Sequence, residues 1–229
     1  MARETASAPS LQPYAERFNK VRGRVIYVLL VMLLLQLTYP LSLLGTTYNA
    51  LYLTAYCALF TSGVYVISVT RRRFVIALGL ALLNLAVGIP WLLIGGFWLT
   101  LGSYSALILF QSLLVFSLLE FVFYSTGVGR DVIYGAVTVY ILFGNMFSAF
   151  YMIIQTLEPG AFTSPEAQEV VWQRMVYFSY ATLTTLGYGD IAPRSAWAQS
   201  VASLEAILGS LYIAVIIGRL IGVYNQGRD

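Results

Sequence analysis

The chain has 229 residues, of which 59% are hydrophobic and only 10% are charged, and its mean hydropathy is +0.78. Because about a quarter of the residues in soluble domains are charged, this composition excludes a soluble globular fold. The net charge of +3 comes from basic residues that flank apolar runs, so it gives no indication of a nucleic-acid partner.

Uncharged runs predict six membrane-spanning helices. No Asp, Glu, Lys or Arg occurs in the 46 residues 25–70, in the 46 residues 74–119 or in the 26 residues 132–157. A spanning helix needs about 20 apolar residues, so the first two runs each accommodate a helical hairpin and the third accommodates one span. A last span is expected over 197–224. The predicted fold is therefore an all-α membrane protein that contacts lipid through several spans.

The basic residues predict the orientation of these spans. Eleven of the 13 lie before the first span, after the second, after the fourth or at the end of the chain, and all four tryptophans lie near the opposite ends of the spans. Lys and Arg accumulate on the cytoplasmic side of a membrane, and Trp favours the interface. We therefore expect both termini in the cytoplasm. We also expect the protein to lie in the cell membrane of a prokaryote.

In chain order, residues 1–24 are predicted to form a cytoplasmic tail, residues 25–124 a four-helix transmembrane unit and residues 132–226 a pore domain. The basic triplet Arg71–Arg73 is interpreted as a loop that anchors the second and third spans. The fourth span, over 99–123, has no basic residue, whereas a voltage sensor needs several charges inside the membrane. We therefore predict no voltage sensing of the S4 type.

Polar residues within the spans predict contacts between helices. Glu120 lies near the cytoplasmic end of the fourth span, and we expect it to pair with Arg130 or with the Arg71–Arg73 triplet. Three amide side chains are expected to hydrogen-bond to neighbouring helices, as such residues usually do in membranes; they are Asn84, Gln111 and Asn145.

The segment that points to function lies between a short helix, predicted over 169–183, and the last span. Its sequence is Ala181-Thr-Leu-Thr-Thr-Leu-Gly-Tyr-Gly-Asp190. Backbone at membrane depth must be buried or line water, and a dehydrated cation needs oxygens that replace its hydration shell. Gly187 and Gly189 permit the backbone angles that turn successive carbonyls to the same side. The hydroxyl of Thr185 can add one further oxygen.

The run Thr184-Thr185-Leu186-Gly187-Tyr188-Gly189-Asp190 resembles the signature filter of the potassium channel family. Over about the last hundred residues, the resemblance implies an outer helix at 132–155, a turret at 156–168, a re-entrant pore helix at 169–183, the filter at 184–190 and an inner helix at 197–224. It also implies that four identical chains surround one axis, so that the functional unit is a homotetramer.

The same resemblance implies which residues hold the permeant ion, K⁺. The ion-binding residues are Thr185, Leu186, Gly187, Tyr188 and Gly189, and the residues that support the filter are Thr182, Thr184 and Asp190. Leu186 departs from the β-branched residue that the family more often has there. Because Leu is less stiff at χ1 than Val or Ile, we expect this departure to affect the rigidity of the filter.

Two residues of the last span are candidates for gating. Gly209 lies twenty residues after Gly189, close to where the family places a hinge glycine; the alternative is close packing between helices. Glu205 lies one turn before Gly209, at a depth where an ionisable residue is a functional hypothesis. We expect Glu205 to pack behind the filter against hydroxyls such as Ser179 or Thr182, or against a neighbouring subunit. The alternative is a structural carboxylate with no role in gating.

The sequence thus predicts a potassium-selective channel that conducts passively through a homotetrameric pore. It predicts no organic cofactor and no enzymatic activity, because the chain has no histidine, no paired thiols and no clustered carboxylates. A weakly selective cation channel and a potassium transporter are the alternatives. The gating stimulus stays open among lipid, tension, carboxylate protonation, a filter gate and constitutive leak.

Overall fold

The computed structural model describes residues 21, 23–42, 46–125, 127, 129–163 and 171–226, and at 38–42, 46–53 and 224–226 it describes the backbone alone. Almost all of the predicted cytoplasmic tail lies outside the described residues. So do residues 164–168 of the predicted turret and the first two residues of the predicted pore helix.

Helices make up most of the described chain. They are α2 (Val25–Ser42), α3 (Thr46–Ile67), α4 (Arg71–Ile94), α5 (Phe97–Tyr124), α6 (Arg130–Leu157), α7 (Trp172–Leu183) and α8 (Ala196–Gln226). Within the described residues, four helices are long and apolar enough to cross a membrane, namely α4, α5, α6 and α8. The helices α2 and α3 lie where the first two spans were predicted, and they are apolar over Val25–Leu37 and Thr54–Ile67.

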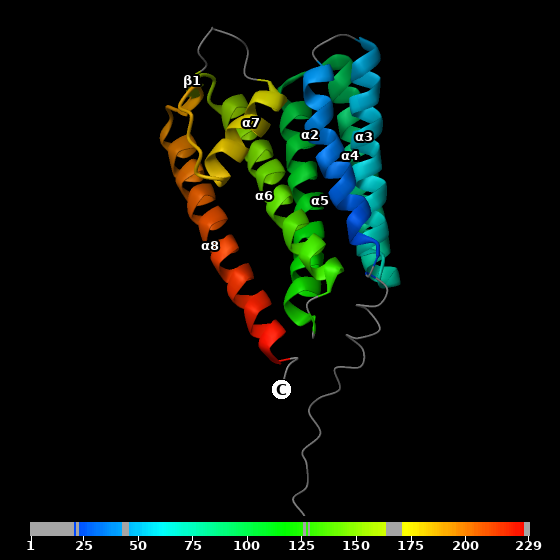
Figure 1. Cartoon of the computed structure of the whole chain (residues 1–229). Helices are drawn as coiled ribbons and strands as arrows, with labels where there is room; N and C mark the ends of the chain where they lie inside the picture. The colour runs from blue at the N-terminus through cyan, green and yellow to red at the C-terminus, as the bar shows by residue number, and fades with distance from the viewer. Residues whose placement is uncertain are drawn as a thin grey trace, which may run out of the picture.

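The helices α2 to α6 run side by side, while α8 stands at the edge of the molecule (Figure 1). The short helix α7 lies at one end, between α6 and α8, and we call this end the filter end because residues 184–190 follow α7 there. At the opposite end, α5 stops at Tyr124 and α6 begins at Arg130, so the connection between them is short. The two helices then pack along each other.

The core between these helices is made by close contacts of small and large residues. Phe110 of α5 is fully buried, and a Cβ added to Gly63 of α3 would lie 2.8 Å from its ring. In the same way, a Cβ added to Gly135 of α6 would lie 3.1 Å from the side chain of Val122 on α5. Small residues let the helices approach closely, which is the usual source of packing energy in membranes.

A two-stranded sheet, which the sequence did not predict, joins the segments on either side of the filter. The strand β1 (Phe162–Thr163) pairs antiparallel with β2 (Ala192–Pro193), so that Phe162 lies opposite Pro193 and Thr163 opposite Ala192. The Thr163 hydroxyl lies 3.1 Å from both the amide nitrogen and the carbonyl oxygen of Ala192. This pairing ties the segment after α6 to the segment that leads into α8.

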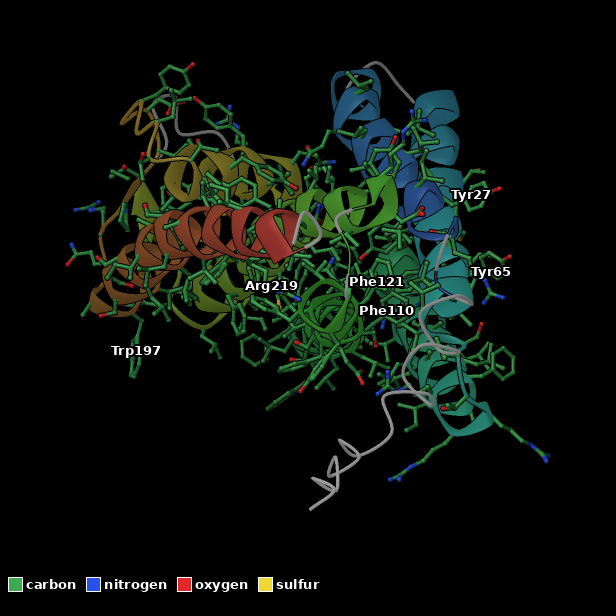
Figure 2. The ribbon with its side chains drawn as sticks, turned by 60° about the horizontal axis from the view of Figure 1, so that its bottom comes forward. Tyr27, Tyr65, Phe110, Phe121, Trp197 and Arg219 are labelled. Carbon is green, nitrogen blue, oxygen red and sulfur yellow. The ribbon has the colours of Figure 1, made fainter. Side chains whose placement is uncertain are left out.

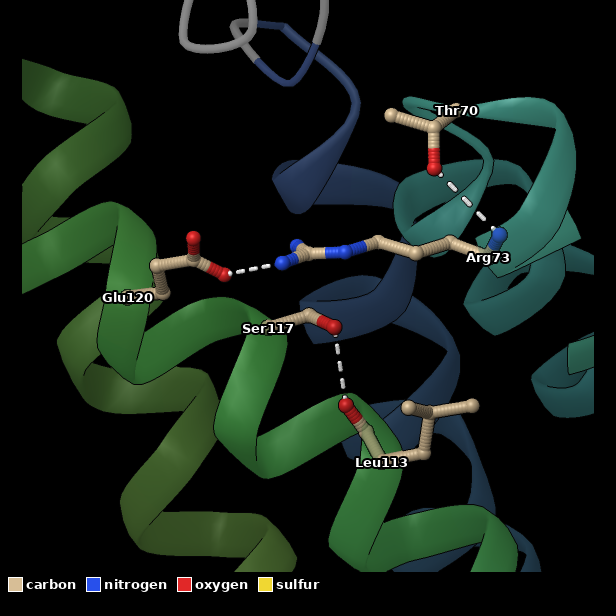
Figure 3. A network of polar contacts seen from close by, with 5 residues as sticks. All are labelled: Thr70, Arg73, Leu113, Ser117 and Glu120. Atoms are coloured by element: carbon tan, nitrogen blue, oxygen red, sulfur yellow. Dashed lines mark hydrogen bonds and ion pairs between the residues drawn. The ribbon is translucent and has the colours of Figure 1, made fainter. Parts of the chain in front are cut away.

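The basic triplet lies in a helix, so its interpretation as a loop is wrong. The helix α4 begins at Arg71, and the hydroxyl of Thr70 accepts a hydrogen bond from the Arg73 amide at 3.3 Å (Figure 3). Such a cap satisfies one of the free amides of a first helical turn. Arg73 also pairs with Glu120 of α5, at 2.7 Å between Nη2 and Oε2. The predicted pairing of Glu120 with the triplet is thereby confirmed.

The three amide side chains predicted to join helices have different outcomes. Asn84 of α4 donates to the Ala106 carbonyl of α5 at 2.9 Å, and Asn145 of α6 lies 3.4 Å from the Tyr180 hydroxyl of α7. Gln111 is fully buried, yet neither of its amide atoms has a hydrogen-bond partner in the described part of the chain. The prediction is therefore confirmed for Asn84 and Asn145 and is wrong for Gln111.

At the end opposite the filter, Arg219 ties α8 to the end of α5. Its Nη2 atom donates to the carbonyls of Phe123 and Ser125, at 2.8 and 2.9 Å. Figure 2 looks onto this end of the molecule and shows Arg219 on α8 and Phe121 on the neighbouring α5. A helix leaves its last carbonyls without partners, and a basic side chain there also matches the helix dipole.

We predict that Arg219→Met destabilises the protein. Hydrogen bonds from charged groups contribute about 1.5–3 kcal/mol, so the free energy of unfolding should fall by a value in this range. Thermal unfolding in detergent, followed by circular dichroism, measures the change. The matched control is Arg71→Met, because the Arg71 side chain is exposed. Equal melting temperatures for the two variants would contradict the prediction.

Candidate ion-conducting site

The pore-helix position is occupied by α7, which is held against α6 by hydrogen bonds and a close contact. The Tyr180 hydroxyl donates to the Ile141 carbonyl at 2.8 Å, and the Tyr140 hydroxyl donates to the Leu183 carbonyl at 3.2 Å. The ring of Tyr180 lies on Gly144, where an added Cβ would come within 2.4 Å of it. The contact therefore requires glycine at position 144 and fixes the second half of α7 on α6.

The backbone after α7 alternates in handedness. Thr185, Gly187 and Gly189 have φ angles of +58°, +57° and +79°. Gly187 and Gly189 thus adopt positive φ angles, which glycine permits. Thr185 is the one described residue other than glycine with a positive φ; a side chain in this region costs about 1–2 kcal/mol. Alternating positive and negative φ turns successive carbonyls to the same side of the chain.

The amides of this segment are bound to the end of α7. The Thr185 amide donates to the Thr182 carbonyl at 2.9 Å, and the amides of Leu186 and Gly187 donate to the Ala181 carbonyl at 2.8 and 3.1 Å. With the amides directed at the helix, the carbonyls of 185–188 accept no backbone hydrogen bond from the described residues. These four carbonyls are therefore free to bind a cation.

The free carbonyls lie on an exposed stretch of one chain. Every residue from 184 to 190 is exposed, and the side chains of Leu186 and Tyr188 are 56% and 66% exposed. Tyr188 stacks on Tyr177 of α7, with ring centres 6.2 Å apart and planes 6° from parallel. Tyr177 also hydrogen-bonds to Asp190. Tyr177 therefore braces the outer half of the segment against α7.

Glu205 is fully buried on α8 and joins three helices. Its Oε1 atom lies 2.5 Å from the Ser179 hydroxyl of α7, and its Oε2 atom accepts a hydrogen bond from the Tyr151 hydroxyl of α6. The predicted contact with Ser179 is present. Thr182 was the other predicted partner of Glu205. Its carbonyl accepts a hydrogen bond from the Thr185 amide. No basic side chain pairs with Glu205 among the residues that the structure describes.

Aromatic rings enclose this carboxyl group. The Tyr151 ring contacts Phe178 of α7 at 5.0 Å and Phe162 of β1 at 5.4 Å, both edge to face. Removal of water strengthens the hydrogen bonds to Glu205 and makes an unsatisfied group there costly. The sheet and the carboxyl group thus support each other, since Phe162 covers Tyr151 while Tyr151 holds Glu205.

Gly209 packs directly against the end of α7. A Cβ at this position would lie 2.4 Å from the Leu183 carbonyl oxygen and 2.9 Å from its Cδ1 atom. Leu183 is the last residue of α7, and its carbonyl also accepts from Tyr140. Gly209 was interpreted either as a hinge or as a site of close packing between helices. The structure shows the contact that close packing requires.

Residues 140–226 match the family model of ion channels. The match covers most of α6, all of α7, the filter-like segment and α8, so this part of the chain is similar to an ion channel domain. The expected resemblance to a channel family is thereby confirmed, and the match is consistent with the potassium channel family. The matched family is one of channels rather than enzymes. No solved structure gives a significant match to the chain.

Several residues of this site were not found from the sequence. Tyr151, Tyr180 and Tyr140 read as ordinary aromatic residues of apolar helices, and their hydroxyls become important only because the fold places acceptors opposite them. Gly144 precedes Asn145, which the sequence did single out, but no local signal distinguishes it from other glycines in the spans. Tyr177 precedes the filter motif by several residues and carries no motif of its own.

We predict that Gly209→Ala distorts the end of α7, because the new methyl group meets a backbone carbonyl that is fixed on its other side. The free energy of unfolding should fall by about 1–3 kcal/mol, which is usual for overpacking, and conduction should be reduced. The matched control is Gly218→Ala on the same helix, where the added Cβ meets nothing within 4 Å of it. Thermal unfolding and bilayer currents measure both effects, and indistinguishable variants would refute the packing role.

We predict that Glu205→Gln is tolerated far better than Glu205→Leu. Gln keeps one acceptor oxygen, for Tyr151, and its NH₂ group can donate to the Ser179 oxygen while Ser179 donates to the Gly144 carbonyl. Leu leaves a buried hydroxyl unsatisfied, at about 1–3 kcal/mol. The double variant Tyr151→Phe with Glu205→Leu should recover part of the loss, since apolar groups then replace both partners. Unfolding in detergent tests the series. A Glu205→Leu variant as stable as the natural protein would overturn the hydrogen-bonding role.

Proposed function

We propose that the protein is a potassium-selective channel in which K⁺ passes down its gradient along the carbonyls of Thr185, Leu186, Gly187 and Tyr188. The observation that carries the proposal is the alternation of φ at Thr185, Gly187 and Gly189 together with the binding of their neighbouring amides to α7. Such a segment presents a row of oxygens that can replace the hydration shell of a K⁺ ion. The Thr185 hydroxyl and the carboxylate of Asp190 add a further ligand and a negative charge at the mouth.

The proposal includes assembly as a homotetramer. One chain offers carbonyls from one side only, and a dehydrated cation needs ligands from all sides. Two further features support contact with other copies. The apolar side chains of α8 are largely exposed, among them Leu204, Leu208 and Leu211. A pocket of about 270 Å³ also opens beside the filter segment, between Tyr177, Thr184 and Leu186, where side chains of an adjacent copy can pack.

In this proposal six helices cross the membrane, with both termini in the cytoplasm, and α7 re-enters from the outer side. The four-helix unit does not sense voltage in the S4 manner, because α5 carries no Lys or Arg between Phe97 and Tyr124. Arg73, whose side chain reaches α5 from α4, forms an ion pair with Glu120.

Single-channel recording in planar bilayers, with K⁺ on one side and Na⁺ on the other, tests the proposal. We expect unitary currents that reverse near the potassium equilibrium potential. Currents that reverse near zero would instead indicate a weakly selective cation channel. Slow, saturable flux without unitary currents would indicate a transporter. The absence of both, after lipid composition, pH and membrane tension have been varied, would refute the proposal.

We predict that Gly187→Ala abolishes selective conduction. Its φ of +57° disfavours any side chain, by about 1–2 kcal/mol, so the carbonyl is expected to turn away from the ion path. Gly160→Ala is the control, because Gly160 also has a positive φ, of +88°, and open space around it, but lies outside the filter segment. The control should keep the natural reversal potential. Equal reversal potentials for the two variants would contradict the assignment of the filter.

A further inference from the structure

The four-helix unit formed by α2 to α5 touches the pore helix directly, at two points. Tyr104 of α5 stacks on Trp172, the first residue of α7, with ring centres 5.4 Å apart and planes 18° from parallel. Gln36 of α2 reaches the middle of α7, where it lines a pocket together with Val176 and Tyr180. The helix that carries the filter segment is therefore held on one side by the channel domain and on the other by the four-helix unit.

A small cavity lies at this second point of contact. It has about 20 Å³ of space for the centre of a water-sized sphere, and its walls come from α2, α3, α6 and α7. About 10–15 Å³ in this measure is enough for one water molecule, while a hydrated ion or an organic ligand needs far more. The lining residues are Leu35, Gln36, Tyr56, Asn145, Trp172, Gln173 and Val176.

The walls of the cavity carry polar groups between apolar surfaces. Apart from Leu35 and Val176, each lining residue carries a side-chain nitrogen or oxygen. The Nε2 atom of Gln36 is buried and has no acceptor at full hydrogen-bond distance in the described part of the chain, and its amide makes only a weak contact with the Tyr180 hydroxyl. Water in a cavity of this size can satisfy such buried polar groups. The cavity thus combines a weakly satisfied donor and the space for one molecule that can accept from it.

We propose that one ordered water molecule occupies this cavity, accepts a hydrogen bond from Gln36 Nε2 and binds the amides of Asn145 or Gln173, so that Gln36 positions the pore helix from the four-helix unit. A bridging water is nearly as favourable as a direct hydrogen bond. Gln36 does not touch the ion path itself. It acts through α7, whose carbonyls at Tyr180, Ala181 and Thr182 hold the amides of the filter segment.

The path from the cavity to the filter is short. Asn145, in the cavity wall, lies 3.4 Å from the Tyr180 hydroxyl, and the Tyr180 carbonyl accepts from both the amide and the hydroxyl of Thr184, at 3.0 and 2.6 Å. A shift of α7 relative to α2 therefore moves the first filter residue. This gives the four-helix unit a role that needs no gating charges.

The variant Gln36→Met tests the proposal, because Met keeps the length of Gln and removes both hydrogen-bonding groups. The matched control is Asn84→Leu, which removes a buried amide and its 2.9 Å bond to Ala106 between α4 and α5 and leaves the lining of the cavity unchanged. We expect hydrogen exchange of the backbone amides in 172–183 to become about fivefold faster in Gln36→Met, corresponding to the loss of roughly one buried hydrogen bond. In Asn84→Leu, exchange there should stay unchanged.

Two further readouts distinguish this proposal from the proposed function. The first, bound water, is independent of the proposed function, and the second, ion selectivity, rests on it. A structure of the natural protein at a resolution that shows water should contain one molecule bonded to Gln36 Nε2, and Gln36→Met should lack it. Gln36→Met should also raise the relative Na⁺ permeability severalfold, while Asn84→Leu should not. An empty cavity, unchanged exchange in Gln36→Met, or equal effects of the two variants would overturn the inference. Faster exchange in Gln36→Met and bound water, in a protein that does not select K⁺, would refute the proposed function. They would still support the water-mediated contact between Gln36 and α7.

Discussion

The structure depends on one constraint, which is that the amides after α7 must point back at the helix so that the carbonyls point away from it. Thr185 holds a positive φ that disfavours its side chain, and the strain persists only where neighbours over-determine the conformation. The carbonyls of Ala181 and Thr182 bind the amides, so the filter segment is only as well placed as the last turn of α7. The hydrogen bonds of Tyr180 to Ile141 and of Tyr140 to Leu183 fix that turn on α6.

Three helices meet behind the filter segment through hydrogen bonds to one buried carboxyl group. Glu205 of α8 receives Tyr151 of α6 and Ser179 of α7, and Ser179 also lies 2.6 Å from the Gly144 carbonyl. One hydroxyl proton cannot serve both of these acceptors at full strength. The arrangement is therefore sensitive to the number of protons on the carboxyl group. These contacts supply what the structural reading of Glu205 requires.

The sequence allowed the apolar helices and the turned backbone after α7 to be predicted, because both depend on local patterns. Uncharged runs located the helices, and Gly187 and Gly189 indicated where the backbone turns. The contact of Glu205 with Ser179 was also predictable, since a buried acid on the last span needs hydroxyls from the pore helix. The basic triplet was misplaced because a single cap, Thr70, extends the helix over it. Gln36, Gly144 and Tyr151 were missed because their roles arise only from approaches between distant segments.

The short connection between α5 and α6 has a consequence for any assembly of several copies. With α5 ending at Tyr124 and α6 beginning at Arg130, and with the two helices packed along each other, the four-helix unit lies beside the pore helices of its own chain. Arg219 and Gln36 make their contacts within that same chain. In the proposed tetramer, a defect in one four-helix unit would therefore act in cis, on the part of the pore that its own chain contributes.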